Sequence, residues 1–153
     1  MRKRFLLGGL VSGIVIFSIA VASFTAVQEE AEKTAIKNVI QMAYIDGIQN
    51  YGNIEDIRKG FHPGFNLLMK RDEAMNKRSI EEWIKIIEKG KQENPSGPAQ
   101  KVTGKFVFID ITGGAAAVKL ELYRNSRHIF TDYLFLYKFS SGWKIVSKIY
   151  HRH

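Results

Sequence analysis

The last third of the chain decides the fold, because four long stretches there read as β-strands. They are KVTGKFVFIDIT (101–112), AAAVKLELYR (115–124), RHIFTDYLFLYKF (127–139) and WKIVSKIYH (143–151). The pairs Gly113-Gly114 and Asn125-Ser126, and then Ser140 to Gly142, separate them, and such residues are typical of tight hairpin turns. Connections this short can join only antiparallel neighbours. The sequence therefore predicts a four-stranded antiparallel meander.

The third of these stretches is apolar on both of its faces. Alternation places Phe130, Leu134 and Leu136 on one face. The other face carries Ile129, Tyr133, Phe135, Tyr137 and Phe139. One face can pack against helices, and the other needs a second cover, for which a partner subunit is the simplest candidate.

Two helices are expected before the meander begins. Residues 29–50 carry an apolar stripe at helical spacing: Ile36, Val39, Ile40, Ala43, Tyr44, Ile48 and Tyr51. Asn53 can cap a short second helix over residues 54–59. Pro63 then biases His62 away from helical geometry and ends it.

A strand, a turn and a third helix are expected next. Residues 65–69 form a short apolar run that predicts a strand, and residues 70–77 are polar and predict a turn. Ser79 and Glu82 have the spacing of a capping box. They predict a helix that runs to about Lys89 with Ile80, Trp83, Ile84 and Ile87 facing inward.

Composition limits the classes of protein and site that remain. The chain has 153 residues, enough for one domain with a substantial core. It has no cysteine, which excludes disulfides, thiol catalysis and thiolate metal sites. The net charge is +8, but acidic and basic residues alternate along the chain without a basic stripe, so no nucleic-acid partner is expected.

The first residues are typical of a protein that leaves the cytoplasm. Arg2, Lys3 and Arg4 precede an apolar run, and Ala20-Val21-Ala22 offers the small side chains that signal peptidase requires. Residues 1–22 therefore predict a signal peptide, with an uncleaved membrane anchor over residues 5–26 as the alternative. Either way, the domain at residues 29–153 is expected outside the cytoplasm, in the periplasm or the extracellular space.

The order of these elements resembles that of the nuclear transport factor 2-like superfamily, which also contains ketosteroid isomerase and the SnoaL-like polyketide cyclases. Within it, the sequence is most similar to the bacterial branch labelled putative lumazine-binding. The matching segments lie between residues 31 and 151. They are Ala35-Ile36 with Val39, Tyr44 with Gly47, Phe61-His62-Pro63, Glu82-Trp83, Ile109 to Gly113, Ala115 to Val118, Thr131 to Leu134, Gly142 to Val146, and Lys148.

This resemblance implies an α+β, cone-shaped fold that is also called cystatin-like. A curved antiparallel sheet would wrap on a long N-terminal helix and two shorter helices, enclose a hydrophobic cavity, and form a homodimer through the sheet. The residues expected to line the cavity and bind a ligand are Tyr44, His62, Trp83, Phe106, Phe130 and Asp132.

Asp132 and His62 are the candidates for chemistry. Asp132 shares a strand face with apolar residues, where loss of solvent would raise its pKa and suit it to proton abstraction. The alternative is a structural pair with Lys148 or with a backbone amide. His62 could act as acid or base at the cavity mouth, or it could fix the turn beside Pro63. The isomerase pattern also needs a second buried acid, and neither Asp110 nor Asp46 has a claim to that role.

Three functions stay open from the sequence. The first is an exported, dimeric module that binds a small apolar or aromatic molecule without catalysis. The second is a dehydratase, isomerase or cyclase that uses Asp132 and His62, and the third is an association module with a filled core. No cofactor is expected and no metal site either, because His151 and His153 share a strand end without a further ligand.

Overall fold

The structure, a computed structural model, describes residues 26–153. The segment predicted as a signal peptide, residues 1–22, lies outside these residues, as does nearly all of the alternative anchor. None of the helices that the structure describes is long and apolar enough to cross a membrane. The chain divides into two units at residue 32, and the second unit, residues 33–153, carries the fold.

The predicted first helix is confirmed, although half of it is wound differently from an α-helix. Residues 33–39 are α-helical, and η1 (Ile40–Gln49) is a π-helix. Its inward stripe is buried as expected, including Ile40, Ala43, Tyr44 and Ile48. The second helix, α2 (Ile54–Gly60), begins where Asn53 accepts a hydrogen bond from the backbone N–H of Glu55.

The region between the helices differs from the prediction. The strand expected over residues 65–69 extends over β1 (Phe61–Arg71). The turn predicted for residues 70–77 is present but covers only residues 72–73, because β2 (Ala74–Ser79) is a strand. β2 pairs antiparallel with β1 from Asn66↔Ser79 to Arg71↔Ala74. β2 is largely exposed on both faces, so its polar residues carry no alternation that would reveal a strand.

The capping box at the start of the third helix is confirmed. The Ser79 hydroxyl accepts from the backbone N–H of Glu82, and the Glu82 carboxylate accepts from the backbone N–H of Ser79. The helix α3 (Ile80–Glu93) runs past the predicted end at Lys89. Its inward face buries the residues predicted to lie there: Ile80, Trp83, Ile84 and Ile87.

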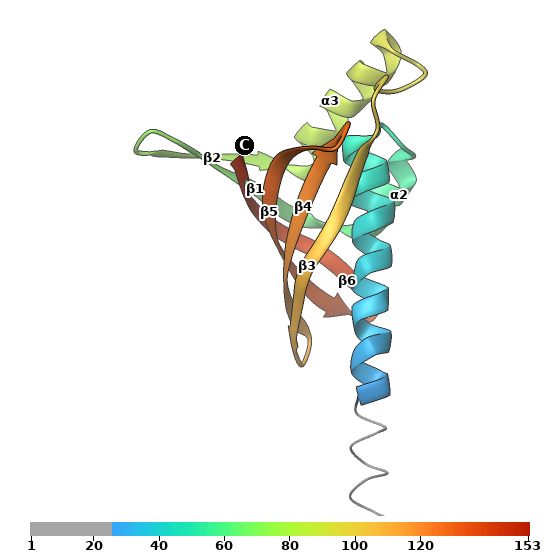
Figure 1. Cartoon of the computed structure of the whole chain (residues 1–153), viewed down its shortest axis with the longest axis vertical. Helices are drawn as coiled ribbons and strands as arrows, with labels where there is room; N and C mark the ends of the chain where they lie inside the picture. The colour runs from blue at the N-terminus through green and yellow to red at the C-terminus, as the bar shows by residue number, and fades with distance from the viewer. Residues whose placement is uncertain (1–25) are drawn as a thin grey trace, which may run out of the picture. The chain divides into compact units, whose positions relative to one another are not determined.

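The meander is confirmed nearly to the residue. It consists of β3 (Val102–Thr112), β4 (Ala115–Arg124), β5 (Arg127–Phe139) and β6 (Gly142–Arg152). The full six-stranded order is β2-β1-β6-β5-β4-β3, and β1 runs parallel to β6, so the sheet is not wholly antiparallel as expected. Irregular pairing occurs in β3–β4, β4–β5 and β5–β6. Such bulges bend strands, and the sheet is strongly curved (Figure 1).

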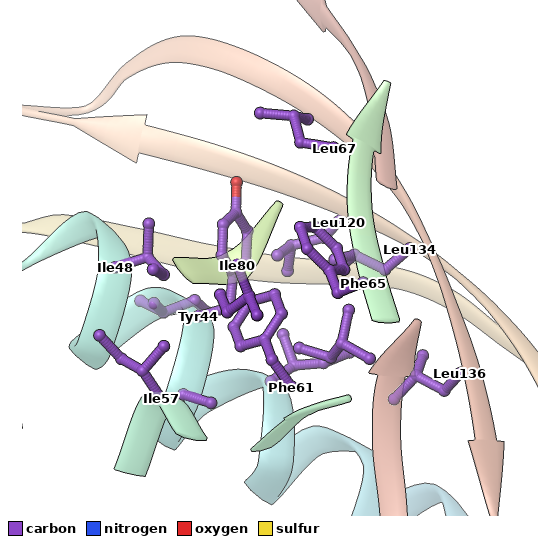
Figure 2. Packing of buried hydrophobic residues seen from close by; sticks show 14 of the residues in the cluster. Tyr44, Ile48, Ile57, Phe61, Phe65, Leu67, Ile80, Leu120, Leu134 and Leu136 are labelled. Atoms are coloured by element: carbon purple, nitrogen blue, oxygen red, sulfur yellow. The ribbon is translucent and has the colours of Figure 1, made fainter. Parts of the chain in front are cut away.

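The core lies between the inner face of this sheet and the helices. Leu120, Leu134 and Leu136 from the sheet pack with Tyr44 of η1 and Phe61 of β1 (Figure 2). Gly104 lets β3 approach η1 closely, because a Cβ at that position would lie 2.4 Å from Cδ1 of Ile45.

Candidate functional site

A carboxylate is buried in the centre of the inner sheet face. Asp132 of β5 is 0% exposed, and its pairing partners are Leu120 of β4 and Tyr150 of β6. An ionised side chain without solvent needs compensating partners, since burying an unpaired charge is strongly unfavourable. Asp132 has two such partners, one on each carboxylate oxygen.

The first partner is Lys148 of β6, whose Nζ lies 2.8 Å from Oδ1 of Asp132. Lys148 is only 4% exposed. Its ammonium lies over the rings of Tyr44, Trp83 and Tyr150, with distances to the ring centroids of 5.0, 5.7 and 4.7 Å. Aromatic faces attract cations, so these rings stabilise the ammonium of Lys148 in addition to the Asp132 carboxylate.

A bulge in β6 makes this pair possible. Phe139 pairs with Gly142 and Leu136 with Ile145, but Phe135 pairs with Ser147, so the register slips by one residue. Ile145 and Lys148 are therefore both buried on the inner face although they are three residues apart. In a regular strand, residues three apart point to opposite faces, and Lys148 would lie on the outside.

The second partner is Tyr44, whose hydroxyl donates to Oδ2 of Asp132 at 2.6 Å. Gln49 in turn donates from Nε2 to the Tyr44 hydroxyl oxygen at 3.0 Å. Residues five apart lie on different sides of an α-helix, whereas the wider i→i+5 winding of η1 brings them together. Gln41 and Asp46 make a second pair of this spacing, at 2.9 Å, so the π-helix aligns Gln49 with Tyr44.

Burial dominates the titration of this network. Loss of solvent raises the pKa of Asp132, although Lys148 and Tyr44 oppose the shift. Burial lowers the pKa of Lys148, and Asp132 opposes that shift. The pKa of Tyr44 is raised well above its ordinary value by burial and then by the Asp132 charge. Burial thus pushes all three groups toward their neutral forms, and only Asp132 and Lys148 have an oppositely charged partner that opposes this by favouring the charged form.

A cavity of about 280 Å³ opens beside the network. Its wall combines apolar and aromatic side chains, among them Leu67, Met69, Trp83 and Phe130, with cationic ones. Lys148 also lines it and therefore joins the buried network to the cavity. A cavity of this kind, with a few polar groups on an apolar wall, is the usual form of a small-molecule site.

The predicted ligand-binding residues lie in different places relative to the cavity. Trp83 and Phe130 line the cavity. Tyr44 and Asp132 are fully buried and do not line the cavity themselves; their partners Gln49 and Lys148 do. Phe106 of β3 lies in the same cross-strand row as Asp132, through Leu120, and packs against the core without lining the cavity.

The structure does not bring His62 and Asp132 together. His62 stacks on Phe139, with ring centroids 4.8 Å apart, and its Nδ1 accepts from the backbone N–H of Gly64 at 3.0 Å. Phe139 lies seven residues beyond Asp132 on β5, which is about 20 Å along a strand. His62 therefore holds its own turn, and a shared proton transfer with Asp132 has no geometric basis.

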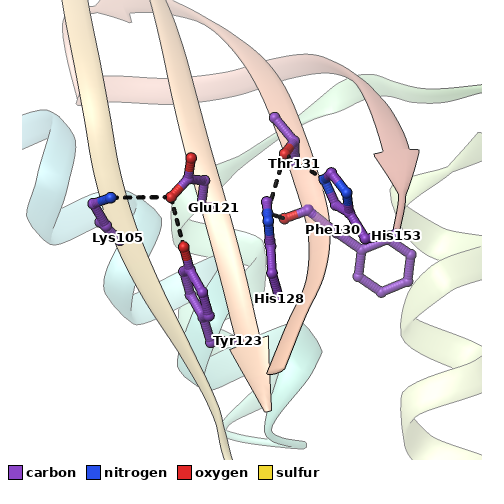
Figure 3. Close-up of polar contacts among 7 residues, drawn as sticks. All are labelled: Lys105, Glu121, Tyr123, His128, Phe130, Thr131 and His153. Carbon is purple, nitrogen blue, oxygen red and sulfur yellow. Dashed lines mark hydrogen bonds and ion pairs between the residues drawn. The ribbon is translucent and has the colours of Figure 1, made fainter. Parts of the chain in front are cut away.

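Three imidazoles gather at the other end of β5 and β6. His128 lies against His153, with ring centroids 3.8 Å apart, and His151 lies 4.8 Å from His153. The Thr131 hydroxyl is within hydrogen-bonding distance of His128 and His153 (Figure 3). Across residues 26–153, no group of three or more side chains has the arrangement to hold a metal ion.

Sequence reasoning missed Gln49 and the arginines of the cavity wall. Arg78, Arg124 and Arg152 come from β2, β4 and β6 and meet only in the folded sheet. Each lies at or next to the last residue of its strand. This shared position is the sequence feature that could have pointed to them. Gln49 could not be found because a helical pattern gives no sign of π-winding.

Comparison with known proteins places the chain in a family. The family described as "Putative lumazine-binding" matches residues 31–151. The chain belongs to this family. Similar solved structures are nuclear transport factor 2-like proteins, so the chain also belongs to that superfamily.

One similar structure is an NTF2-like (nuclear transport factor 2-like) protein of unknown function from Shewanella baltica. It is 25% identical with a TM-score of 0.61, and the match covers 80% of this chain and 94% of that one. A domain of unknown function with a cystatin-like fold, from Nostoc punctiforme, shares the fold at 14% identity and a TM-score of 0.58, over 80% of this chain and 78% of that one. The expected fold is thereby confirmed.

A relative with a named activity is the aldolase FrzH of a Cladobotryum species. It is 28% identical over 109 residues, which are 71% of this chain and 82% of the relative. Together with the family, it is consistent with a fold that binds small molecules.

Proposed function

We propose that this protein is an exported binding protein for a small molecule with a flat apolar body. The observation that carries the proposal is the cavity on the inner sheet face, where Trp83 and Phe130 offer aromatic surface. Trp83 is itself braced by edge contacts with Tyr44 and Phe61, at centroid distances of 6.0 and 6.4 Å. A ring held in place before binding loses little freedom when the ligand arrives. Since the cavity is open, a filled association module is disfavoured.

Binding without catalysis is the simplest use of this site. Asp132 has both oxygens engaged, by Lys148 and by Tyr44, and it is shielded from the cavity. A general base must reach the proton that it removes, and Asp132 reaches only its own partners. The network therefore serves to hold Lys148 and Tyr44 in place behind the binding surface.

A blocked cavity tests this proposal. Met69 lines the cavity, whereas Met75 of the β1–β2 hairpin is exposed and does not. Native mass spectrometry of protein purified from its own host should show a retained small molecule. Met69→Trp should remove it and Met75→Trp should keep it. Retention by both variants, or no bound molecule and no binding of a naphthalene-type fluorescent probe by the wild type, would refute the cavity as a binding site.

A second function is favoured by Lys148 itself. Lys148 lines the cavity and its pKa is lowered by burial, which are the properties of an amine that attacks a carbonyl. One relative is named an aldolase, and aldolases act on carbonyl compounds. Lys148 Nζ would lose its proton to Asp132, add to a ketone or aldehyde carbon and release one water to form an imine.

Borohydride trapping tests this second function. Incubation with a small aldehyde and sodium borohydride should leave one reduced adduct on Lys148, detected by peptide mass spectrometry. Lys85 of α3, an exposed lysine on the same helix as Trp83, serves as the internal control for unselective labelling. Equal labelling of both lysines would exclude imine chemistry at this site.

We also propose that the outer sheet face pairs with a second copy of the chain. Tyr133, Phe135, Tyr137 and Phe139 project from β5 with Ile149 of β6 beside them, all more than a third exposed. On the same face, Ala115 and Ala117 leave a hollow of about 210 Å³ next to Phe135. A surface that carries both a projecting ring and a hollow can be self-complementary about a two-fold axis.

Sedimentation velocity tests the dimer. The wild type should sediment as a dimer, and Phe135→Asp should sediment as a monomer with an unchanged circular dichroism spectrum. Met75→Asp places the same charge on an exposed methionine of the hairpin and should stay dimeric. A monomeric wild type at micromolar concentration would contradict this proposal.

Export is proposed on the sequence of residues 1–22 alone. Expression of the full chain followed by intact-mass analysis should give a product that begins after Ala22 in the soluble extracytoplasmic fraction. A full-length product in the membrane fraction would instead support the anchor, and a full-length cytoplasmic product would refute both.

A further inference from the structure

We infer that the cavity selects ligands that carry an oxyanion, such as a carboxylate, sulfonate or phosphate, beside the apolar body. The inference rests on the proposed binding function and specifies its ligand class. The charged residues that line the cavity are Arg78, Arg124, Lys148 and Arg152, and among the residues that the structure describes no aspartate or glutamate lines it. An uncharged ligand would leave this one-sided set of charges unused.

The arginines are not neutralised by the protein in the way that Lys148 is. Lys148 has Asp132 at 2.8 Å. In the part of the chain that the structure describes, the ion pairs involve other cations, Arg58, Lys59, Lys89 and Lys105 among them, and none joins a carboxylate to Arg78, Arg124 or Arg152. Arg78 is partly offset by the nearby Glu82 carboxylate, but Arg124 and Arg152 keep an uncompensated positive charge, which attracts anions.

Arg152 is also placed next to the apolar wall. Its guanidinium lies 5.3 Å from the ring centroid of Phe130, and Phe130 meets Tyr150 edge-on at 5.5 Å. A guanidinium that lies over a ring keeps its N–H donors at its rim, where they can form a fork with two oxygens of an anion. A ligand with its ring on Phe130 or Trp83 would thus bring a substituent oxyanion to Arg152.

The positive charge continues into a neighbouring hollow of about 330 Å³. Arg124, Phe130 and Arg152 line both spaces, and Arg127 and His153 are added in the hollow. Within residues 26–153, no acidic side chain lines this hollow either. The anionic end of a ligand is therefore expected to point from the cavity toward the hollow, while its apolar end lies toward Trp83.

Two fluorescent probes that differ in one group test the inference. 1-Anilinonaphthalene-8-sulfonate carries a sulfonate, and N-phenyl-1-naphthylamine has the same rings without it. The sulfonate probe should bind more tightly by about tenfold or more, and its affinity should fall as salt is raised, because salt screens exposed charges. Equal affinity of the two probes would overturn the inference and leave the proposed function standing. Failure of both to bind would count against the proposed function itself.

Charge-removing variants locate the effect. The double change Arg124→Gln/Arg152→Gln should weaken the sulfonate probe by about tenfold, as expected for two solvent-screened ion pairs, and should leave the neutral probe unchanged. Arg71→Gln removes an exposed arginine of the hairpin that lines neither space and should change nothing. An equal loss in Arg71→Gln would mean unspecific attraction and would refute the site. Met69→Trp should abolish binding of both probes, which separates the cavity from the apolar outer face.

Displacement identifies the source of the oxyanion. Laurate is a small soluble anion with an apolar chain, and it should displace the sulfonate probe from the wild type. If only vesicles of phosphatidylglycerol displace it, the same oxyanion chemistry belongs to a lipid head group. Displacement by dodecanol as readily as by laurate would contradict selection for an anion.

Discussion

The two faces of β5 reverse the usual distribution of polar and apolar residues. On the inner face, between buried leucines, Asp132 holds an ion pair with Lys148. On the outer face, aromatic rings stand exposed, and Tyr137 reaches 55% exposure. Both departures are unfavourable in free energy, because charged groups are buried away from water on the inner face and aromatic rings are exposed to water on the outer face. The difference indicates that the inner face is built to position groups beside a cavity and the outer face to meet another surface.

The largest expected effect comes from breaking the inner pair. Asp132→Ala leaves the Lys148 ammonium buried without its carboxylate and the Tyr44 hydroxyl without its acceptor. We expect a loss of about 3–5 kcal/mol in the free energy of unfolding, the usual cost of an uncompensated buried charge. Urea unfolding followed by circular dichroism measures this change.

The paired substitution shows whether the charge or the volume is responsible. Asp132→Leu/Lys148→Met removes both charges and keeps apolar volume, so it should be more stable than either single variant. If the double variant is no more stable than Asp132→Leu alone, the pair does not explain the loss, and the inner face is an ordinary core.

Adjacent residues on β5 provide the next comparison. Leu134 is 0% exposed and Phe135 is 44% exposed. Leu134→Ala should cost about 2–5 kcal/mol at every protein concentration, since it opens a cavity in the core. Phe135→Ala should lower the free energy of unfolding by less than about 1 kcal/mol at the lowest protein concentration. The difference from the wild type should grow as the protein concentration is raised, because association stabilises the wild type alone. A large loss for Phe135→Ala that does not depend on concentration would contradict an outer face that forms a dimer.

The fold was predictable wherever the signal is local. Hairpin turn residues and alternation located β3 to β6, and the capping box at Ser79 located the start of α3. β2 was missed because a mostly exposed strand shows no alternation. The parallel pairing of β1 with β6 was missed too, because it joins segments about eighty residues apart and depends on the packing of everything between them.

The site was less predictable, because it depends on register and winding. Strand alternation correctly placed Asp132 inside among apolar residues. The bulge in β6 that turns Lys148 inward shifts the register by one residue, and the sequence of β6 does not mark it. The π-winding of η1, which brings Gln49 to Tyr44, likewise has no pattern that a helical period would reveal. Arginines from three strands converge only after the sheet has curved.

A hydroxyl can be removed from either face for a smaller effect. Tyr44→Phe takes away the donor to Asp132 and the acceptor for Gln49. It should cost about 1–3 kcal/mol in urea unfolding, as for a hydrogen bond to a buried charged group. Tyr133→Phe makes the same change on the outer face, where the side chain is 38% exposed, and should leave stability unchanged. Similar losses in both variants would remove the distinction between the faces.

The smallest expected effect is the pH dependence of stability in the acid range, which reports on the buried carboxyl of Asp132. Burial raises the pKa of Asp132. At pH values between the unfolded and the folded pKa, the carboxyl is therefore protonated in the folded protein and ionised in the unfolded chain. The resulting stabilisation is complete below the unfolded pKa of about 3.9 and is lost as pH rises through the higher folded value. Urea unfolding from about pH 3 to about pH 6 should therefore show the wild type losing stability relative to Asp132→Leu/Lys148→Met as pH rises. Subtracting the double variant cancels the surface carboxyls that both proteins share. A wild type that gains on the double variant over this range would mean that Lys148 and Tyr44 outweigh burial and hold Asp132 ionised below its usual pKa.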